Sequence, residues 1–216
     1  MPESERIIDF GGVPLGRDRH ICAFFHTLEE EYRVLLPFIK EGFERGEKAF
    51  HVVDPEQRVD HLSRLQKAGI DTQAAEQRGQ LEVRPWQDAH FRPGCFDQDA
   101  MLTLIEEEVL RRGAALGYLQ TRFVAHMEWA LEDMPGVNDL VEYESRLNYV
   151  VSKYQDPVIC TYDCAKFGAA VVMDILRTHP LVIIGRVLQH NPFYVPPDEF
   201  LLELRERGAF RATSAA

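Results

Sequence analysis

The densest group of chemically versatile side chains is the octapeptide RFVAHMEW at positions 122–129, which follows a predicted buried strand. The planar guanidinium of Arg122 suits a ligand carboxylate, and the rings of His126 and Trp129 suit a pocket that is partly apolar. The alternative is structural: Trp129 packs in the core, and Arg122 pairs with an acid such as Glu144. On the first interpretation, Arg122, His126 and Trp129 bind a ligand.

A second group of polar side chains lies on one face of a predicted helix. Glu144 and Asn148 are four residues apart, about one helical turn, and Tyr143 precedes them directly. We expect all three to face the same crevice as the octapeptide and to contribute to ligand binding. The alternative is a core tyrosine beside a surface acid.

The ends of the predicted strands are the next place to look, because ligands of open α/β sheets bind beyond the carboxyl ends of the strands. After Phe25 the chain reads Thr27-Leu-Glu-Glu-Glu31, whereas a phosphate-binding loop needs glycines and a lysine. Three carboxylates would repel a triphosphate, so we predict no P-loop NTPase. The strand ending in Asp163 is similar to a Walker B strand, but a helix-capping aspartate would look the same. We keep Phe25 and Asp163 as ligand-binding candidates.

Histidine and cysteine side chains share one face of the first predicted strand, where His20, Cys22 and Phe24 alternate. With Cys160, they offer the ligand types of a metal site. A structural histidine and small apolar core cysteines are the simpler interpretation. We therefore predict no metal and no cofactor, and we retain His20 as a ligand-binding candidate. No Gly-x-Ser-x-Gly elbow is present, and no catalytic residue is predicted.

The elements that must position these side chains alternate between buried strands and amphipathic helices, which predicts a three-layer, doubly wound α/β domain with a mostly parallel sheet. The strands are predicted at Ile21–Phe25, Ala49–Val53, Leu81–Pro85, Tyr118–Val124 and Val158–Tyr162, with a sixth at Leu181–Ile184. Pro37 should interrupt the helix after the first strand. Residues 190–197 read as a loop, Glu199–Arg205 as a short closing helix, 1–18 as an N-terminal extension and 205–216 as a flexible tail.

Composition excludes several classes of protein. The net charge is −11, and the largest basic group is the pair Arg111-Arg112, so we predict no direct binding to DNA or RNA. The apolar runs are too short for a membrane helix, and the first residues do not form a signal peptide. Four cysteines in 216 residues are typical of a reducing compartment, so we expect a cytoplasmic protein.

The order and spacing of several short motifs resemble the MEDS family, the methanogen/methylotroph, DcmR-type sensory domain. The motifs are His20-Ile-Cys-Ala-Phe-Phe, Leu36-Pro-Phe-Ile-Lys-Glu-Gly-Phe-Glu-Arg-Gly-Glu47, Arg122 with Met127-Glu-Trp129, Tyr143-Glu144 with Leu147-Asn148, Cys160-Thr-Tyr-Asp163, His179-Pro180 and Asn191-Pro192. The resemblance implies a RecA/KaiC-like core without a Walker A loop over residues 19–204, used as a sensor of small hydrocarbon derivatives. His126 stands where we expect a smaller residue in the family's turn, so the pocket here should be narrower or more polar.

The functional prediction is a non-enzymatic, cytoplasmic sensory module that binds a small organic molecule. Family members often carry a DNA-binding or kinase-like output domain, and none is recognised here, so we expect signalling through a regulatory partner protein or a homo-oligomer. One alternative is a degenerate nucleotide binder or weak Mg²⁺-dependent NTPase using Asp163 and one of the residues 29–31. Another is a pure interaction protein whose crevice is vestigial.

Overall fold

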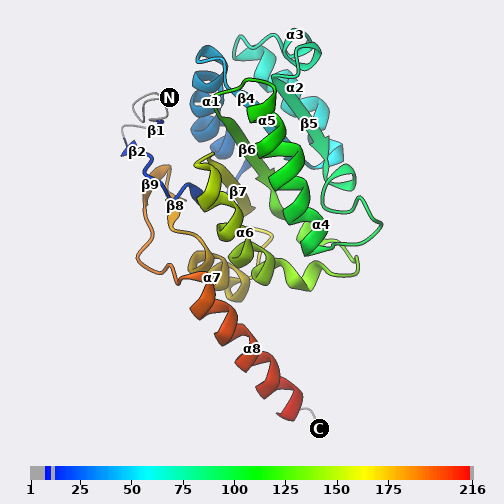
Figure 1. Cartoon of the computed structure of the whole chain (residues 1–216), viewed down its shortest axis with the longest axis vertical. Helices are drawn as coiled ribbons and strands as arrows, with labels where there is room; N and C mark the ends of the chain where they lie inside the picture. Colours follow the sequence, from blue (N-terminus) through cyan, green and yellow to red (C-terminus); the bar gives the residue numbers. More distant parts are fainter. Residues whose placement is uncertain (1–7, 11–12, 215–216) are drawn as a thin grey trace.

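A seven-stranded sheet forms the centre of the structure, a computed structural model that describes residues 8–10 and 13–214 (Figure 1). Its strands are β3 (His20–Phe25), β4 (Lys48–Val53), β5 (Leu81–Pro85), β6 (Thr121–His126), β7 (Val158–Asp163), β8 (Leu181–Ile184) and β9 (Val187–His190). The spatial order is β5-β4-β6-β7-β3-β8-β9, and every neighbouring pair is parallel except β8 and β9. The predicted mostly parallel α/β sheet is confirmed.

Helices cover both faces of the sheet and make two separate cores. The helices are α1 (Leu28–Glu44), α2 (Arg58–Lys67), α3 (Thr72–Gln77), α4 (Gln98–Thr103), α5 (Arg112–Ala115), α6 (Leu140–Tyr154), α7 (Ala169–Thr178) and α8 (Pro197–Ser214), with a π-helical segment at Leu104–Arg111. Apolar residues of α1, α2 and α3 pack on one face, and those of α4, α6 and α7 on the other. Successive strand residues point to opposite faces, so Ile21 and Ala23 enter the first core while Cys22 and Phe24 enter the second.

Strand β6 begins three residues later than predicted and ends at His126 rather than Val124. The preceding helix ends in a Schellman turn, in which Tyr118 N–H donates to Gly113 O and Gly117 has a φ of 89°. Tyr118 therefore still belongs to the end of that helix. As a result, Arg122 lies near the amino end of the strand, not after its carboxyl end.

The turn after β3 uses its own side chains to satisfy the first amides of α1. Thr27 Oγ accepts from Glu30 N–H at 3.1 Å, and the Glu30 carboxylate accepts from His26 N–H at 3.0 Å. These two contacts resemble a capping box and occupy two of the amides that a phosphate would need. Helix α1 then runs without interruption through Pro37, which the sequence predicted as a break.

The two ends of the described chain both differ from expectation. Strands β1 (Asp9–Phe10) and β2 (Val13–Pro14) form a hairpin, and Ile8, Phe10 and Leu15 are buried in the α1 face, so this part of the predicted extension packs on the domain. Residues 1–7, 11–12 and 215–216 lie outside the described structure. The predicted tail is helical as far as Ser214, because α8 continues through it.

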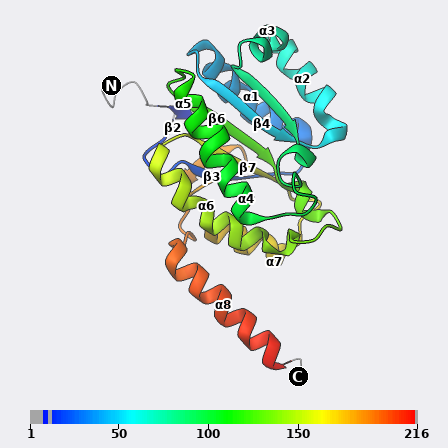
Figure 2. The ribbon, with the colours of Figure 1, turned by 45° about the vertical axis from the view of Figure 1, so that its right-hand side comes forward.

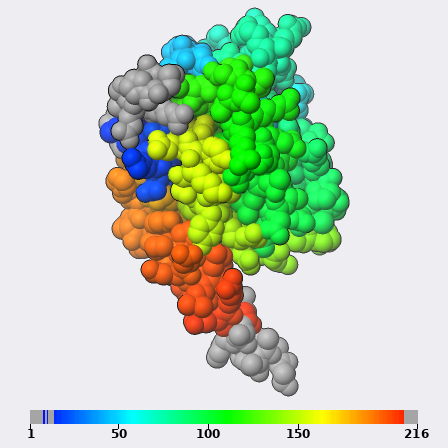
Figure 3. Space-filling view, viewed as in Figure 1, coloured from blue at the N-terminus to red at the C-terminus, as the bar shows by residue number. Residues whose placement is uncertain are grey.

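Helix α8 extends away from the body of the domain in Figures 1 and 2, and Figure 3 shows its first turns leaving one end of the rounded body. None of the described helices has the length and apolar content needed to cross a bilayer.

Candidate functional site

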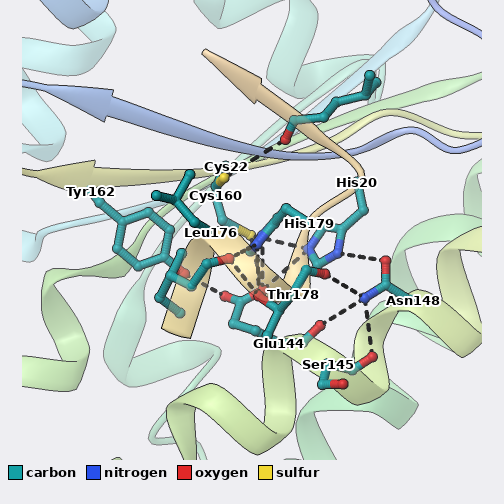
Figure 4. A network of polar contacts seen from close by, with 12 residues as sticks. His20, Cys22, Glu144, Ser145, Asn148, Cys160, Tyr162, Leu176, Thr178 and His179 are labelled. Carbon is teal, nitrogen blue, oxygen red and sulfur yellow. Dashed lines mark hydrogen bonds and ion pairs between the residues drawn. The ribbon is translucent and has the colours of Figure 1, made fainter. Parts of the chain in front are cut away.

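Four side chains with metal-ligating or acid-base chemistry meet beneath the sheet, on the α6 and α7 face (Figure 4). They are His20 from β3, Glu144 from α6, Cys160 from β7 and His179, which follows α7; we call them the Glu144 cluster. One carboxylate oxygen, Glu144 Oε2, lies 3.2 Å from His20 Nε2, 3.3 Å from His179 Nε2 and 3.6 Å from Cys160 Sγ. All four side chains are at most 1% exposed.

Local structure explains why these four side chains converge. Strands β3 and β7 are adjacent and in register, with Cys22 opposite Cys160, so alternation sends His20 and Cys160 to the same face. Glu144 faces the sheet between the buried residues of α6. His179 has extended backbone, as expected before Pro180, and this directs the chain from α7 into β8 beside β3.

The His20 ring is oriented by Asn148, one turn after Glu144 on α6. Asn148 Nδ2 donates to three backbone carbonyls, those of Glu144, Ser145 and Thr178, at 3.2, 3.1 and 2.8 Å. Asn148 therefore presents its oxygen to His20 Nδ1, 3.2 Å away. Because this oxygen only accepts, Nδ1 of a neutral His20 carries the proton and Nε2 presents a lone pair to Glu144.

The His179 ring is oriented in the same way by the end of α7. Its Nδ1 lies 3.0 Å from the carbonyl oxygen of Ile175 and 2.8 Å from Thr178 Oγ1. Since a carbonyl only accepts, Nδ1 carries the proton and Nε2 is bare. Within the described chain, His179 Nε2 has no hydrogen-bond partner, although it faces Glu144 Oε2.

The remaining contacts of the cluster hold the carboxylate in place. Tyr162 O–H donates to Glu144 Oε1 at 2.9 Å, and Cys160 Sγ also lies 3.7 Å from His20 Nε2. No Lys or Arg among the described residues pairs with Glu144; its ion-pair partners there are the two histidines. Burial and the neighbouring His179 lower the pKa of His20 to about 4.

The carboxyl ends of the strands form only a small crevice of about 40 Å³, lined by Phe25, Glu31, His126, Glu128 and Asp163 among others. His126 Nε2 pairs with Glu31 at 2.9 Å. Asp163 accepts from the N–H of Ala165 at 2.8 Å and pairs with Lys166. The predicted strand-end candidates Phe25, His126 and Asp163 do come together here, in a narrow and mostly acidic space.

Arg122 is separated from this crevice and makes its contacts elsewhere, although its Nη2 is buried without a hydrogen-bond partner among the described residues. Its guanidinium pairs with Glu47 at 2.6 Å and with Glu41 at 3.0 Å, and it lies over the Phe38 ring. The alternative prediction, that Arg122 pairs with Glu144, is wrong, because Glu144 lies on the other face of the sheet. Gly42 leaves room for the guanidinium, since a Cβ there would approach Arg122 to 2.7 Å. These contacts give Arg122 a structural role.

Trp129 and Tyr143 belong to an aromatic group on the α6 face rather than to the strand-end crevice. Trp129 is fully buried in a short 3₁₀ helix after β6, stacked on His90 with ring centroids 4.4 Å apart. Phe96 packs against both Trp129 and Tyr143. His90 also forms part of the wall of an open cavity of about 520 Å³, which we call the His90 pocket.

A second histidine network, which sequence reasoning missed, lies on the α1 and α2 face. Tyr32 O–H is 2.5 Å from His61 Nδ1, and His61 Nε2 is 2.9 Å from His51 Nδ1. We call this series the His61 chain. Burial lowers the pKa of His51 to about 3 and that of His61 also well below its usual value.

The structure thus divides the predicted ligand-binding residues among four places. His20, Glu144 and Asn148 come together with Cys160, while Cys22 lies beside them and donates to Leu181 O. Sequence reasoning missed His179, although the pair His179-Pro180 just before a predicted strand could have indicated it.

Comparison with known proteins agrees with this fold. A KaiC-like protein from Pyrococcus horikoshii superimposes with a TM-score of 0.57 at 19% identity, over 80% of this chain and 72% of that one, which supports the predicted KaiC-like fold class. The transcriptional repressor DcmR of Methylorubrum extorquens is 25% identical over 170 residues, or 78% of this chain. The chain spans 60% of the length of that repressor.

The family model of MEDS, the methanogen/methylotroph, DcmR sensory domain, matches residues 19–180. That match covers both histidines of the Glu144 cluster as well as Glu144 and Cys160. The chain belongs to the MEDS family of sensory domains.

Proposed function

We propose that this chain is a non-enzymatic sensory module that binds a small, neutral organic molecule and passes the signal to a regulatory partner protein. The His90 pocket carries the proposal. It has the volume of a small-molecule site, about 520 Å³. The family of the chain supports the sensory role, and the name of the related repressor supports a regulatory role.

The polar atoms behind the wall of the His90 pocket lack partners. His90 is 1% exposed, and neither of its ring nitrogens forms a hydrogen bond to any residue that the structure describes. Trp129 Nε1, behind it, is equally buried and unpartnered in the described structure. Unpaired buried polar groups are destabilising, and a ligand oxygen or nitrogen that reaches His90 would relieve this.

The charges around the pocket favour a neutral ligand. Burial lowers the pKa of His90 to about 3, so the ring is uncharged at neutral pH. The acids at the rim are already engaged: Asp97 caps α4, and Glu108 pairs with Arg84 and Arg92. An alcohol, aldehyde, amide or halogenated hydrocarbon of small size fits these conditions, in keeping with the hydrocarbon derivatives that the family resemblance implies.

Ligand-dependent thermal stability tests the proposal. A ligand at about 100 times its dissociation constant adds about 2.7 kcal/mol, and for a chain of this size that raises the Tm by about 5–11 °C. We expect such a shift with at least one member of a panel of neutral small organic molecules. Ala100→Trp, which fills the pocket, should abolish the shift, whereas His190→Gln on the edge strand β9 should keep it.

A panel without any shift, or a shift that survives Ala100→Trp, would contradict ligand binding in the His90 pocket. The panel includes ATP with Mg²⁺, because the sequence left a degenerate nucleotide binder as the alternative. The strand-end crevice gives that alternative little support, since it holds about 40 Å³ and is lined by three carboxylates, Glu31, Glu128 and Asp163. Co-purification of one stoichiometric partner with no ligand effect would favour a pure interaction protein.

A further inference from the structure

We propose that His20, Glu144, Cys160 and His179 bind one divalent transition-metal ion of the zinc class. This site is distinct from the His90 pocket and does not depend on the proposed function. It also reverses the sequence-based expectation that the chain has no metal site, which considered His20, Cys22 and Cys160 but not Glu144 or His179.

Four of the six distances between the ligand atoms of the Glu144 cluster are close to those of a tetrahedral site. Zinc bonds of about 2.0–2.3 Å, directed to the corners of a tetrahedron, hold the ligand atoms about 3.3–3.6 Å apart. Glu144 Oε2 lies 3.2, 3.3 and 3.6 Å from His20, His179 and Cys160, and Cys160 Sγ lies 3.7 Å from His20 Nε2. All four ligand atoms lie within 4.8 Å of one another. Two imidazoles, a carboxylate and a thiolate form a donor set that suits zinc.

The proton positions leave the centre of the cluster without a donor from either histidine. Asn148 and the Ile175 carbonyl fix the protons of His20 and His179 on Nδ1, so both Nε2 atoms direct lone pairs toward Glu144 Oε2. Glu144 Oε2 thus faces two bare nitrogens, at 3.2 and 3.3 Å, and these contacts are repulsive until a proton or a metal ion lies between the atoms. A metal ion supplies that positive charge to all three at once.

A second layer of residues orients every ligand except the cysteine, as in established metal sites. Asn148 holds His20, Ile175 O holds His179, and Tyr162 holds the other Glu144 oxygen. A bound dication would also neutralise the cluster, since its two charges balance the Glu144 carboxylate and a Cys160 thiolate.

A surface pocket lies next to the cluster. It has a volume of about 170 Å³ and is lined by His20 and Asn148, together with Asp18, Tyr149 and Pro180. Two residues of the cluster and its surroundings therefore also border a pocket that is open to the surface.

Metal analysis of the full-length chain, purified without a metal-binding tag, tests the proposal. We expect close to one equivalent of zinc or a similar metal in the wild type, and little or none in Cys160→Ala and His179→Ala. The matched control is Cys22→Ala, because Cys22 is equally buried and lies opposite Cys160 on the adjacent strand. This variant should keep its metal.

Cobalt provides a readout that does not depend on the metal acquired during expression. The metal-free chain titrated with Co²⁺ should develop the visible bands of a tetrahedral complex and a thiolate-to-cobalt charge-transfer band. Cys22→Ala should retain the charge-transfer band and Cys160→Ala should lose it. Asn148→Ala, which removes a positioning residue, should weaken Co²⁺ binding about 10–100-fold while keeping the band.

Two results would overturn the proposal: a wild-type chain that carries no metal and gives no charge-transfer band with Co²⁺, or a Cys160→Ala variant with wild-type metal content. If Cys160→Ala does not fold, the cobalt spectrum of the wild type decides alone. Failure of the organic-ligand panel has no bearing on these measurements, so the two proposals fail separately.

Discussion

Two buried histidine networks lie on opposite faces of one sheet and use the same side chain differently. In the Glu144 cluster, two imidazoles point their bare nitrogens at a single carboxylate oxygen. In the His61 chain, Tyr32, His61 and His51 follow one another in a line, each joined to the next by one short contact. The first network converges, and the second is serial.

The difference lies in how many protons each arrangement can use. A serial chain needs one proton in each gap, and neutral imidazoles with one tyrosine hydroxyl provide this in either direction. A convergent cluster has one centre and several lone pairs, so it calls for a multiply bonded cation. Both networks are buried, so their geometry and their donor types separate a hydrogen-bonded core from a candidate metal centre.

Removal of the shared carboxylate should have the largest effect. Glu144→Ala takes away the group to which both histidines point, and loss of one partner of a buried charged group costs about 3–5 kcal/mol. Urea unfolding at constant pH measures this loss. The matched change on the other face is Glu31→Ala, which removes a carboxylate that contacts one histidine and is 12% exposed. Equal losses in the two variants would mean that a second histidine adds nothing to the role of the buried Glu144 carboxylate.

Two Tyr→Phe variants, one in each network, remove the same hydroxyl group and compare the stability that it contributes. Tyr162→Phe removes a donor to a carboxylate, which costs about 1.5–3 kcal/mol, whereas Tyr32→Phe removes a hydrogen bond between neutral groups, worth about 0.5–1.5 kcal/mol. Both are measured by chemical denaturation. A larger loss for Tyr32→Phe would mean that the His61 chain carries charge.

His126, next to the His61 chain, gives the most pH-dependent effect. Burial lowers its pKa, but the Glu31 carboxylate outweighs this and raises it to about 8. Because the folded pKa exceeds the unfolded value of about 6.5, the stabilisation is complete below pH 6.5 and disappears as the pH rises through 8. The expected loss is about 2 kcal/mol.

Unfolding measured from pH 6 to pH 9 checks the titration of His126. His126→Gln, which does not titrate, should show a flatter profile over this range. A wild-type profile that does not fall above pH 7 would contradict the assigned ion pair with Glu31.

Much of the fold could be predicted from the sequence, because buried parallel strands appear as short apolar runs. The start of β6 could not be predicted, because Tyr118 and Leu119 continue the apolar pattern of the strand. In the structure, a Schellman turn still holds Tyr118 to the preceding helix. The length of α8 was missed for a related reason. Most of its described side chains are exposed or half-buried, so it has no continuous apolar stripe to recognise.

The sequence could predict only those parts of the candidate site that lie within a single strand or helix. Strand alternation put His20 and Cys22 on one face, and helical spacing linked Glu144 to Asn148. Joining these pairs to His179 requires knowing that β8 lies beside β3, which depends on the order of strands in the sheet. The convergence of the Glu144 cluster is therefore a property of topology, not of any local motif.

Helix α8 is anchored at its base to the segment that carries one histidine of the Glu144 cluster. Its 18 residues span about 27 Å. Phe200 is buried at its base under the guanidinium of Arg177, which also pairs with Glu203. Arg177 stands two residues before His179, so the anchor of the long helix and the histidine that faces Glu144 belong to the same short stretch of backbone.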